Sequence, residues 1–231
     1  MLRVESIHAG YGDFRVLHGV SLDVGQGQAV GVVGPNGHGK STLLKAVCGL
    51  LPVSQGRVIF DGEDITALDT QQRVERGLAY VAEDRRLFGD MSVLENLQLG
   101  AYLPRARRLR KQNLERVFAL YPRLAERRDQ LARTLSGGEA QMLALGRGLM
   151  SAATCLAIDE PSLGLAPKLI ESLLLTIAEI NREGTTVLLV EQNLALIAPL
   201  MQRAYGLEEG HLSCIELGAA SNSLINSAQE A

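Results

Sequence analysis

The sequence has few cysteines, and no two of them form a pair. Cys48, Cys155 and Cys214 lie far apart along the chain, with no C-x-x-C spacing among them. Zinc sites and disulfide frameworks depend on clustered or regularly spaced cysteines, so neither is expected here. Isolated thiols of this kind suit a reducing cytoplasm.

Long apolar runs and a positive net charge are absent as well. No stretch approaches the run of about 18 apolar residues that predicts a membrane-spanning helix, and the N-terminal residues lack the apolar core of a signal peptide. We therefore expect a protein that neither crosses a membrane nor is exported. The formal net charge is -3 and the sequence pI is about 5.9, so no overall positive field would attract nucleic acid. No nucleic-acid partner is expected.

Proline is sparse, with 7 residues in a chain of 231, and 46% of the residues are hydrophobic. This composition is typical of a folded globular protein rather than a disordered or fibrous one. A chain of this length buries about 70% of its unfolded surface, so a substantial core is expected.

Short, almost wholly apolar segments recur along the chain. They are residues 28–33, 156–158 and 186–190. Runs of this kind suit parallel strands that are buried on both faces. Helical patterns over residues 42–50 and 169–180 lie among them, so the repeating unit is β-α-β and the fold class is α/β.

The N-terminal part has a different pattern. Apolar residues partly alternate over residues 2–24, and Val20, Leu22 and Val24 share one face. Such alternation predicts antiparallel strands with one solvent-exposed face. We expect a small antiparallel β-layer at the start of the fold.

Residues 91–135 lack β-branched runs and have a helix-turn-helix pattern. Ser92 and Glu95 form a capping box that opens a helix, and two prolines interrupt the pattern that follows. We interpret this segment as a helical insertion. Within it, residues 105–111 hold five basic residues in seven. We expect a solvated loop there, with contact to lipid headgroups or an acidic partner as the alternative.

Together these patterns predict one domain over residues 1–231. Residues 1–90 would hold the β-layer and the start of the core, residues 91–135 the helical insertion, and residues 136–220 the rest of the core. Residues 221–231 are mostly small and polar, and we expect a flexible tail there.

A glycine-rich segment follows the first buried strand and precedes a helical pattern. It matches G-x-x-x-x-G-K-[ST], and its residues are Gly34, Pro35, Asn36, Gly37, His38, Gly39, Lys40 and Ser41. In this context the backbone N–H groups cradle phosphates, aided by the positive end of the following helix. Lys40 would neutralise charge on the β- and γ-phosphates, and Ser41 would bind Mg²⁺. We therefore predict an ATP site that also includes Thr42.

His38 is the unusual residue of this segment. The cradle uses backbone donors at this position, so we expect the imidazole to point away from the phosphates and to have no chemical role. Replacing His38 with Ala should then leave nucleotide affinity nearly unchanged.

Two acidic residues, Asp159 and Glu160, follow the second buried strand. The carboxyl ends of parallel strands form the ligand-binding edge of an open sheet, so both acids are expected beside the phosphate cradle. Asp159 is suited to hold Mg²⁺, and Glu160 is suited to polarise the attacking water as the catalytic carboxylate.

A second candidate anion site begins another helix. Ser136 and Glu139 form a capping box, and Gly137 and Gly138 allow close approach of a ligand. One ATP needs only one cradle, so a second phosphate site on the same chain suggests head-to-tail dimerisation. Each nucleotide would lie between one subunit's cradle and the other subunit's Ser136, Gly137 and Gly138. A purely structural helix cap is the alternative.

With these motifs the chain resembles the nucleotide-binding subunits of ABC transporters, whose LSGGQ or LSGGE signature is matched by residues 135–139. The resemblance covers nearly the whole chain. It implies a RecA-like P-loop ATPase core with an N-terminal antiparallel β-layer and an inserted helical subdomain. It assigns Tyr11 to stacking on adenine, residues 34–41 to the Walker A loop and residues 156–160 to the Walker B strand. Glu83 lies where most relatives have a glutamine that senses the γ-phosphate and faces the membrane partner, so we place it among the nucleotide- and metal-binding residues.

Departures from the family pattern indicate a branch within it. Gln192 replaces the usual switch histidine, and Ala166 stands where most relatives have Asp. With Glu83, these residues resemble the smaller ATPase of branched-chain amino-acid uptake systems, a branch that includes urea and short-chain amide importers. Gln192 can donate a hydrogen bond to the γ-phosphate but carries no titrating proton. We expect slower hydrolysis at this chain's own cradle, with Glu160 maintaining residual activity.

The resemblance also implies partners and a location. The partners are a second ABC ATPase subunit, two transmembrane permease subunits and, indirectly, an extracytoplasmic solute-binding protein. We expect a heterodimer of ATPases, with a homodimer as the alternative, placed peripherally on the cytoplasmic face of the cytoplasmic membrane. Other functions left open are an ATPase of another transport system, including lipid export, and a regulatory module with little turnover. A chromosome-organising or translation-linked ATPase is a further alternative.

Overall fold

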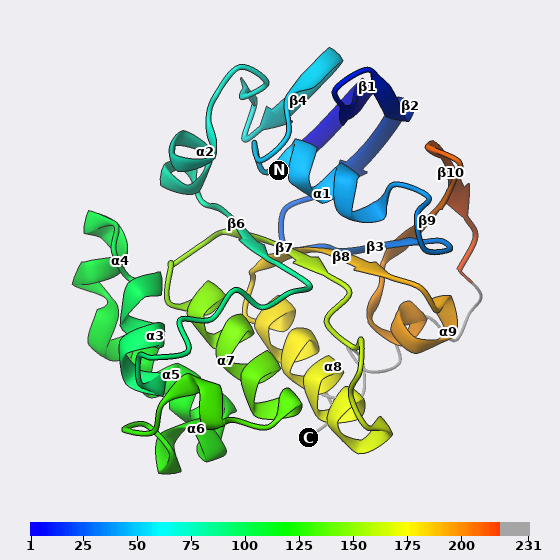
Figure 1. Cartoon of the computed structure of the whole chain (residues 1–231). Coiled ribbons are helices and arrows are strands. Elements are labelled where there is room, and N and C mark those ends of the chain that lie inside the picture. Colours follow the sequence, from blue (N-terminus) through cyan, green and yellow to red (C-terminus); the bar gives the residue numbers. More distant parts are fainter. Residues whose placement is uncertain (218–231) are drawn as a thin grey trace.

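The computed structural model describes residues 1–217, which form two β-sheets with helices between and beside them (Figure 1). The predicted tail at 221–231 lies outside the described residues. Within the described part, no helix has the length and hydrophobicity that a membrane crossing requires.

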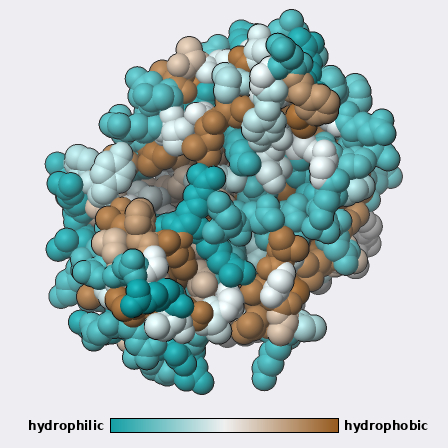
Figure 2. Space-filling model, in the orientation of Figure 1, coloured by the Kyte–Doolittle hydropathy of each residue, from teal (hydrophilic) through white to brown (hydrophobic). Residues whose placement is uncertain are grey.

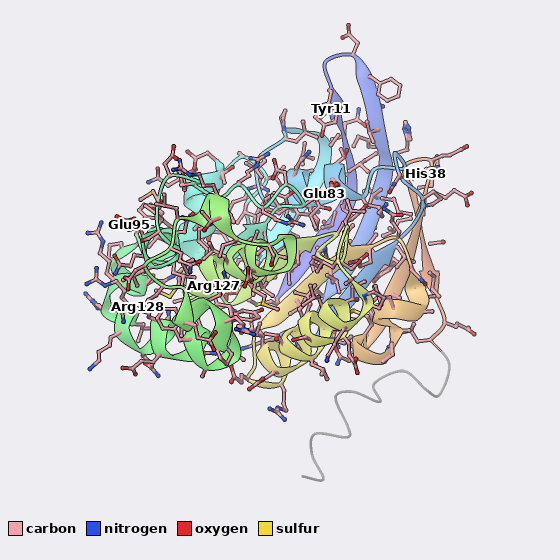
Figure 3. The ribbon with its side chains drawn as sticks, turned by 60° about the horizontal axis from the view of Figure 1, so that its bottom comes forward. Tyr11, His38, Glu83, Glu95, Arg127 and Arg128 are labelled. Carbon is pink, nitrogen blue, oxygen red and sulfur yellow. The ribbon has the colours of Figure 1, made fainter. Side chains whose placement is uncertain are left out.

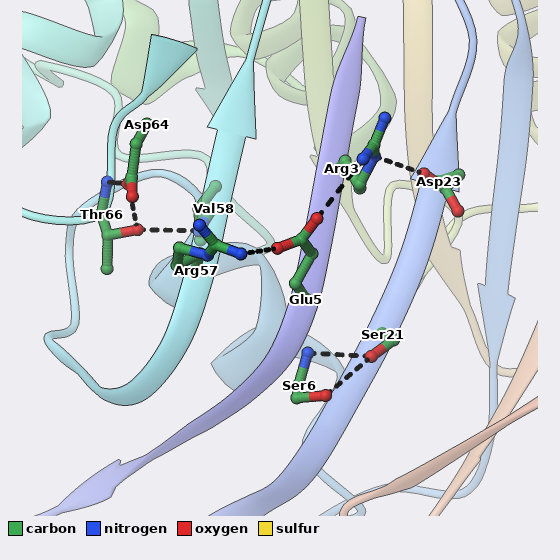
Figure 4. A network of polar contacts seen from close by, with 9 residues as sticks. All are labelled: Arg3, Glu5, Ser6, Ser21, Asp23, Arg57, Val58, Asp64 and Thr66. Atoms are coloured by element: carbon green, nitrogen blue, oxygen red, sulfur yellow. Dashed lines mark hydrogen bonds and ion pairs between the residues drawn. The ribbon is translucent and has the colours of Figure 1, made fainter. Parts of the chain in front are cut away.

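The first sheet is antiparallel and forms the upper layer of Figure 1. Its strands, in spatial order, are β2 (Phe14–Val24), β1 (Leu2–Tyr11), β4 (Val53–Phe60) and β5 (Glu63–Asp64). Val20, Leu22 and Val24 are buried on its inner face, as the alternating pattern predicts. A row of charged and hydroxyl side chains lies on this sheet, linked in part by the Glu5–Arg57 ion pair at 2.9 Å (Figure 4). One face of the sheet is therefore apolar and the other polar.

The second sheet is parallel except at one edge. Its strands, in spatial order, are β10 (His211–Ile215), β9 (Arg203–Glu208), β3 (Ala29–Val33), β8 (Thr186–Glu191), β7 (Cys155–Asp159) and β6 (Leu78–Val81). Only β10 runs antiparallel to its neighbour. Strands β3, β7 and β8 are buried along their whole length, which confirms the parallel strands predicted from the apolar runs.

Each central strand contributes to two hydrophobic cores because successive side chains point to opposite faces. Val30 and Val32 pack in the core that contains α1 (Lys40–Val47) and the antiparallel sheet. Ala29 and Val33 pack in the other core, which contains α7 (Gly137–Leu149) and α8 (Pro167–Arg182). Helix α1 thus lies between the two sheets, and α7 and α8 cover the far face of the parallel sheet (Figure 1).

The predicted insertion is helical but more finely divided than a helix-turn-helix. It contains α3 (Val93–Gly100), α4 (Pro104–Arg108), α5 (Arg110–Leu120), α6 (Pro122–Glu126) and the 3-10 turn η1 (Ala132–Thr134). The capping box of Ser92 with Glu95 is present at the start of α3. Both interrupting prolines occupy the first turn of a helix, where a missing N–H costs nothing.

The basic stretch of residues 105–111 is not the loop that we expected. It spans α4 and the first turn of α5. Arg105 anchors it, because its guanidinium donates to the carbonyl oxygens of Val74 at 2.7 Å and Glu75 at 2.5 Å. The predicted loop is wrong, but Arg107, Arg108, Arg110 and Lys111 are exposed, as predicted for a solvated segment. Arg105 is the exception, because its partners lie in a distant segment that the local charge pattern does not reveal.

Short helices complete the fold. They are α2 (Thr70–Arg76), α9 (Leu194–Ile197) and the 3-10 turn η2 (Ala198–Leu200). Helix α2 is fixed to the end of α1 by the buried Arg73, which donates to the carbonyl oxygens of Ala46 at 2.8 Å and Val47 at 2.6 Å. These carbonyls belong to the last turn of α1, so Arg73 caps the C-terminal end of that helix.

Candidate active site

The predicted phosphate cradle connects β3 to α1. Gly39 stands immediately before α1 with a φ of 106°, in the left-handed region that glycine adopts without strain. A Cβ on Gly34, at the other end of the loop, would overlap the carbonyl oxygen of Leu207 in β9. The glycines are therefore required by backbone shape and by close packing, and the loop leads directly into a helix N-terminus that favours anions.

Lys40 is buried and its ammonium group has two partners. It donates to the carbonyl oxygen of Pro35 at 3.0 Å and pairs with Glu160 Oε1 at 2.9 Å. Lys40 and Glu160 are only 3% and 7% exposed. A buried charge pair of this kind is maintained when each ion has further hydrogen bonds, as here. The two residues that sequence analysis assigned to phosphate and to water are thus in direct contact.

Glu160 leaves the strand at an unusual angle. Its φ is 40°, and its backbone N–H donates to the carbonyl oxygen of Val190 in β8 at 3.0 Å. Its second carboxylate oxygen, Oε2, accepts a hydrogen bond from Gln192 Nε2 at 2.8 Å. Lys40 and Gln192 together hold the carboxylate from two sides. Gln192, which we expected at the γ-phosphate, donates its amide to Glu160 in this structure.

Asp159 ends β7 and faces the start of α1. Its Oδ1 accepts from Ser41 Oγ at 3.0 Å, and its Oδ2 accepts from Tyr80 OH at 2.7 Å. Burial raises the pKa of Asp159, while the two hydroxyl donors act in the opposite direction. Burial also raises the pKa of Tyr80, and the neighbouring Asp159 charge adds to that effect, so the phenol stays a donor.

Tyr80 and Glu191 are site residues that sequence reasoning missed. Glu191 ends β8 and is buried, and its Oε1 accepts from the backbone N–H of Ser162 at 3.0 Å. It therefore attaches the loop after Glu160 to the neighbouring strand. Burial is the main cause of the raised pKa of Glu191. No local motif marks either residue, because each acts across a strand pairing.

Glu83 lies in the loop after β6 and is exposed. Its pKa is raised, first by partial desolvation and then by the charges of Glu160 and Asp159. The charges of Glu160 and Asp159 thus act on Glu83. Its role in nucleotide or metal binding stays a prediction. The loop is attached to α7 through Arg147, whose guanidinium donates to the carbonyl oxygens of Arg85 at 2.8 Å and Arg86 at 2.7 Å.

The second candidate anion site begins α7. Ser136 Oγ accepts from the backbone N–H of Glu139, and the Glu139 carboxylate accepts from the backbone N–H of Ser136 at 2.9 Å, so the predicted capping box is present. Ser136 and Gly137 are exposed at this helix start. Gly138 is buried against α8. A Cβ at this position would lie only 2.5 Å from the Leu169 side chain, so the packing of α7 on α8 favours glycine here.

Tyr11 lies at the tip of the β1–β2 hairpin and is 50% exposed. Its ring is therefore available to stack on a ligand. In Figure 3 Tyr11 lies in the upper part of the view, His38 at the right and Glu83 between them near the centre, while Glu95, Arg127 and Arg128 lie at the left over the helical segment. Phe14, which pairs with Tyr11 across the hairpin, is 73% exposed and is a further aromatic at this tip.

Comparison with known proteins decides the family. The family described as ABC transporter matches residues 17–163, a range that includes the phosphate cradle, the signature and both acids. This chain belongs to the ABC transporter family. It is an ATP-hydrolysing cassette coupled to transport.

Relatives of this cassette cover nearly all of it. The high-affinity branched-chain amino acid transport ATP-binding protein BraG of Pseudomonas aeruginosa is 42% identical over 95% of this chain and 94% of its own length. The probable branched-chain amino acid transport ATP-binding protein LivF of Archaeoglobus fulgidus is 36% identical over 92% of this chain and 90% of its own. The lipopolysaccharide export system ATP-binding protein LptB of Haemophilus influenzae is 31% identical over 89% and 86%.

Solved ABC cassettes share the fold. A nucleotide-free ATP-binding cassette from an ABC transporter superposes with a TM-score of 0.83 at 28% identity, covering 100% of this chain and 95% of that one. A bacterial ABC transporter cassette solved as a dimer gives a TM-score of 0.81 at 26% identity, covering 94% and 99%. Dimeric assembly therefore occurs among cassettes of this fold.

The residues of this cassette also fit a magnesium ion. Mg²⁺ prefers oxygen ligands and is commonly held by one or two protein oxygens together with phosphates. Ser41 Oγ and Asp159 Oδ1 supply a hydroxyl and a carboxylate oxygen that already meet at 3.0 Å. When bound, such an ion neutralises charge that develops on the phosphates.

Proposed function

We propose that this chain is one ATPase of a paired ABC importer that powers uptake of branched-chain amino acids or a related small polar solute. The observation that carries the hydrolytic part is the buried Glu160 carboxylate, held by Lys40 and Gln192 beside the Ser41–Asp159 pair. The solute is inferred from the two branched-chain relatives, since the residues of a cassette do not identify what its transporter carries.

The contact between Lys40 and Glu160 gives the two residues linked roles. Phosphate oxygens entering the cradle compete with Glu160 Oε1 for the Lys40 ammonium group. Once Lys40 turns to the phosphates, Glu160 Oε1 is released to accept a proton from the attacking water. Gln192 holds the other carboxylate oxygen and so keeps the base oriented. Tyr11 is proposed to stack on the adenine, and residues 34–42 to bind the phosphates.

Head-to-tail pairing completes each nucleotide site in this proposal. The exposed Ser136 and Gly137 at the start of α7 would contact the nucleotide held by the other ATPase. Support comes from the glycine-lined helix start and from the dimeric solved cassette. A heterodimer is proposed because Gln192 and Ala166 depart from the family pattern, so the partner's own cradle would turn over faster.

A permease surface is proposed beside the loop that contains Glu83. Phe88, Leu99 and Tyr102 are exposed and line a shallow hollow of about 620 Å³ with Arg86 and Arg147. The Arg147 guanidinium lies 5.9 Å from the centre of the Phe88 ring. Figure 2 shows apolar side chains gathering on this side of the molecule, over the helical segment. Exposed aromatics around an arginine are typical of contact surfaces. A peripheral position on the cytoplasmic face of the membrane follows from this proposal.

Trapping the complex tests the assembly and the solute together. A Glu160→Gln variant with ATP should stabilise the closed dimer, because the amide cannot accept the proton from water. We expect a second ABC ATPase and two membrane permeases to co-purify from membranes, and the reconstituted complex to take up a branched-chain amino acid. Recovery of the variant alone, from membranes where wild-type permease is expressed, would contradict the assembly.

Lipid export is the second candidate, because the LptB relative is 31% identical over 89% of this chain. Vesicles containing the purified complex separate the two functions. Accumulation of radiolabelled leucine inside vesicles supports import, whereas extraction of lipid without leucine uptake supports export. Phosphate release by the purified chain, alone and with its partner, separates both from a regulatory module with little turnover.

A further inference from the structure

All four histidines of this chain are close to the β9–β10 hairpin or to β2. His18 pairs with His8 across β1 and β2, and its ring stacks on His211 with 5.2 Å between ring centres. His38 contacts the turn of the same hairpin. This grouping places one residue of the phosphate cradle against a turn that lies far from it in sequence.

Two hydrogen bonds connect His38 to that turn. Its ring nitrogen Nδ1 accepts from the backbone N–H of Glu209 at 3.0 Å. Its carbonyl oxygen accepts from the backbone N–H of Gly210 at 3.2 Å. Both the side chain and the main chain of His38 are therefore used, and the imidazole acts as an acceptor at Nδ1.

The turn that holds His38 is itself fixed to β2. The carbonyl oxygen of Gly210 accepts from the backbone N–H of His18 at 2.9 Å. A Cβ on Gly210 would overlap the carbonyl oxygen of Val16, so the turn packs directly on the strand. At the opposite end of the cradle, Gly34 packs just as closely against Leu207 of β9. One hairpin thus supports the cradle at both ends.

We propose that His38 is a positioning residue for nucleotide binding, acting through its Nδ1 bond to Glu209 rather than by touching phosphate. The bond holds the cradle backbone in the shape that directs its N–H groups inward, so less ordering is required when phosphate binds. The proposal replaces the expectation that His38→Ala leaves affinity unchanged, and it rests on the proposed nucleotide site.

Substitutions at His38 distinguish the contribution of the Nδ1 hydrogen-bond acceptor from that of the imidazole ring as a whole. Asn places its side-chain oxygen where Nδ1 stood, whereas Gln places its polar atoms one methylene farther out, and Ala has no acceptor. We expect Ala and Gln to weaken MgADP binding about fivefold, the effect of one neutral hydrogen bond. Asn should bind within about twofold of wild type by the same reasoning. His211→Ala is the matched control, since it removes the stacked ring from the same hairpin but leaves the Glu209 bond.

Isothermal titration calorimetry with MgADP on the purified full chain gives the affinities, and steady-state phosphate release gives KM and kcat. The expected signature is a raised KM at unchanged kcat for Ala and Gln, with rescue by Asn. Thermal midpoints from circular dichroism identify any variant that has merely lost stability. Equal affinities for wild type and Ala, or an Asn variant as weak as Ala, would overturn the proposal. Failure of wild type to bind MgADP at all would instead reject the nucleotide site itself.

Discussion

Removing the amide of Gln192 should slow hydrolysis by acting on Glu160. Gln192 Nε2 donates to Glu160 Oε2 at 2.8 Å, and Glu160 is 7% exposed. Gln192 is exposed, so water can reach the vacated position, but a mobile water does not orient the carboxylate as the fixed amide does. A hydrogen bond to a charged group contributes about 1.5–3 kcal/mol. If that free energy holds the carboxylate in its productive position, Gln192→Ala should lower kcat about 10- to 100-fold, since each 1.36 kcal/mol is tenfold. KM should change little.

Single-turnover phosphate release measures the chemical step directly when the partner's own catalytic carboxylate has been changed to an amide, so that only this chain's site contributes. Gln130→Ala is the control, because Gln130 is exposed in the helical segment and far along the chain from both acids. The decisive comparison is a double-variant cycle. In a Glu160→Gln background, Gln192→Ala should cause almost no further loss, because both changes affect the same base.

The opposite result would refute this reasoning. If Gln192→Ala lowers the rate by the same factor in both backgrounds, Gln192 acts on the nucleotide independently of Glu160. The hydrogen bond seen between them would then be incidental to catalysis, and the γ-phosphate contact expected from sequence would be favoured.

Three further predictions concern stability, measured by urea unfolding followed by circular dichroism because the chain has no tryptophan. Gly100→Ala would place a methyl group against a backbone oxygen of α7 and should destabilise the fold by about 3 kcal/mol. Gly89→Ala is the control and should have little effect, because the nearest atom to its methyl group, Arg133 Cβ, lies 3.4 Å away. Tyr80→Phe removes the donor to Asp159 and should lower stability by about 1–3 kcal/mol; an unchanged midpoint would mean that another donor takes its place. The pKa of Glu139 is lowered, mainly by the backbone N–H of the capping serine, so its stabilisation is complete at neutral pH and is lost as pH falls from about 4.3 through the lower folded value. Glu139→Gln should therefore flatten the acid limb of stability against pH, and parallel limbs would contradict the assignment.

Local patterns predicted much of the fold. The buried strands, the β-layer and both capping boxes are each encoded within a few residues, by periodicity or by a serine three positions before a glutamate. These features arise from interactions between residues that are close in the chain, so one sequence is enough to predict them. The solvent exposure predicted for residues 105–111 holds for most of their basic side chains, but the loop is wrong. The contact from Arg105 to the end of α2 was not predictable, because it joins segments about thirty residues apart.

In the candidate site, too, the residues were predictable from local motifs, whereas the contacts between them were not. Lys40, Ser41, Asp159 and Glu160 were predicted as a set because the ends of parallel strands meet at one edge of a sheet. Their pairing was not predictable, since side-chain geometry decides that Lys40 contacts Glu160 and that Tyr80 reaches Asp159. Hydrogen bonds of this kind depend on strand register and on the left-handed turn at Glu160, which no motif records.

The bonds from Arg147 to the loop after Glu83 limit how this cassette deforms. Arg147 holds two carbonyls of that loop, and Arg85 in turn donates to Gln141 of α7 at 2.9 Å. Arg85 and Arg86 have φ values of 59° and 47°, so the loop is already bent into a shape that few residues adopt. A displacement of this loop that leaves α7 in place would have to lengthen or break these three hydrogen bonds. The loop and α7, the helix that opens with the signature, are therefore joined at three points, so we expect a displacement of either one to be transmitted to the other.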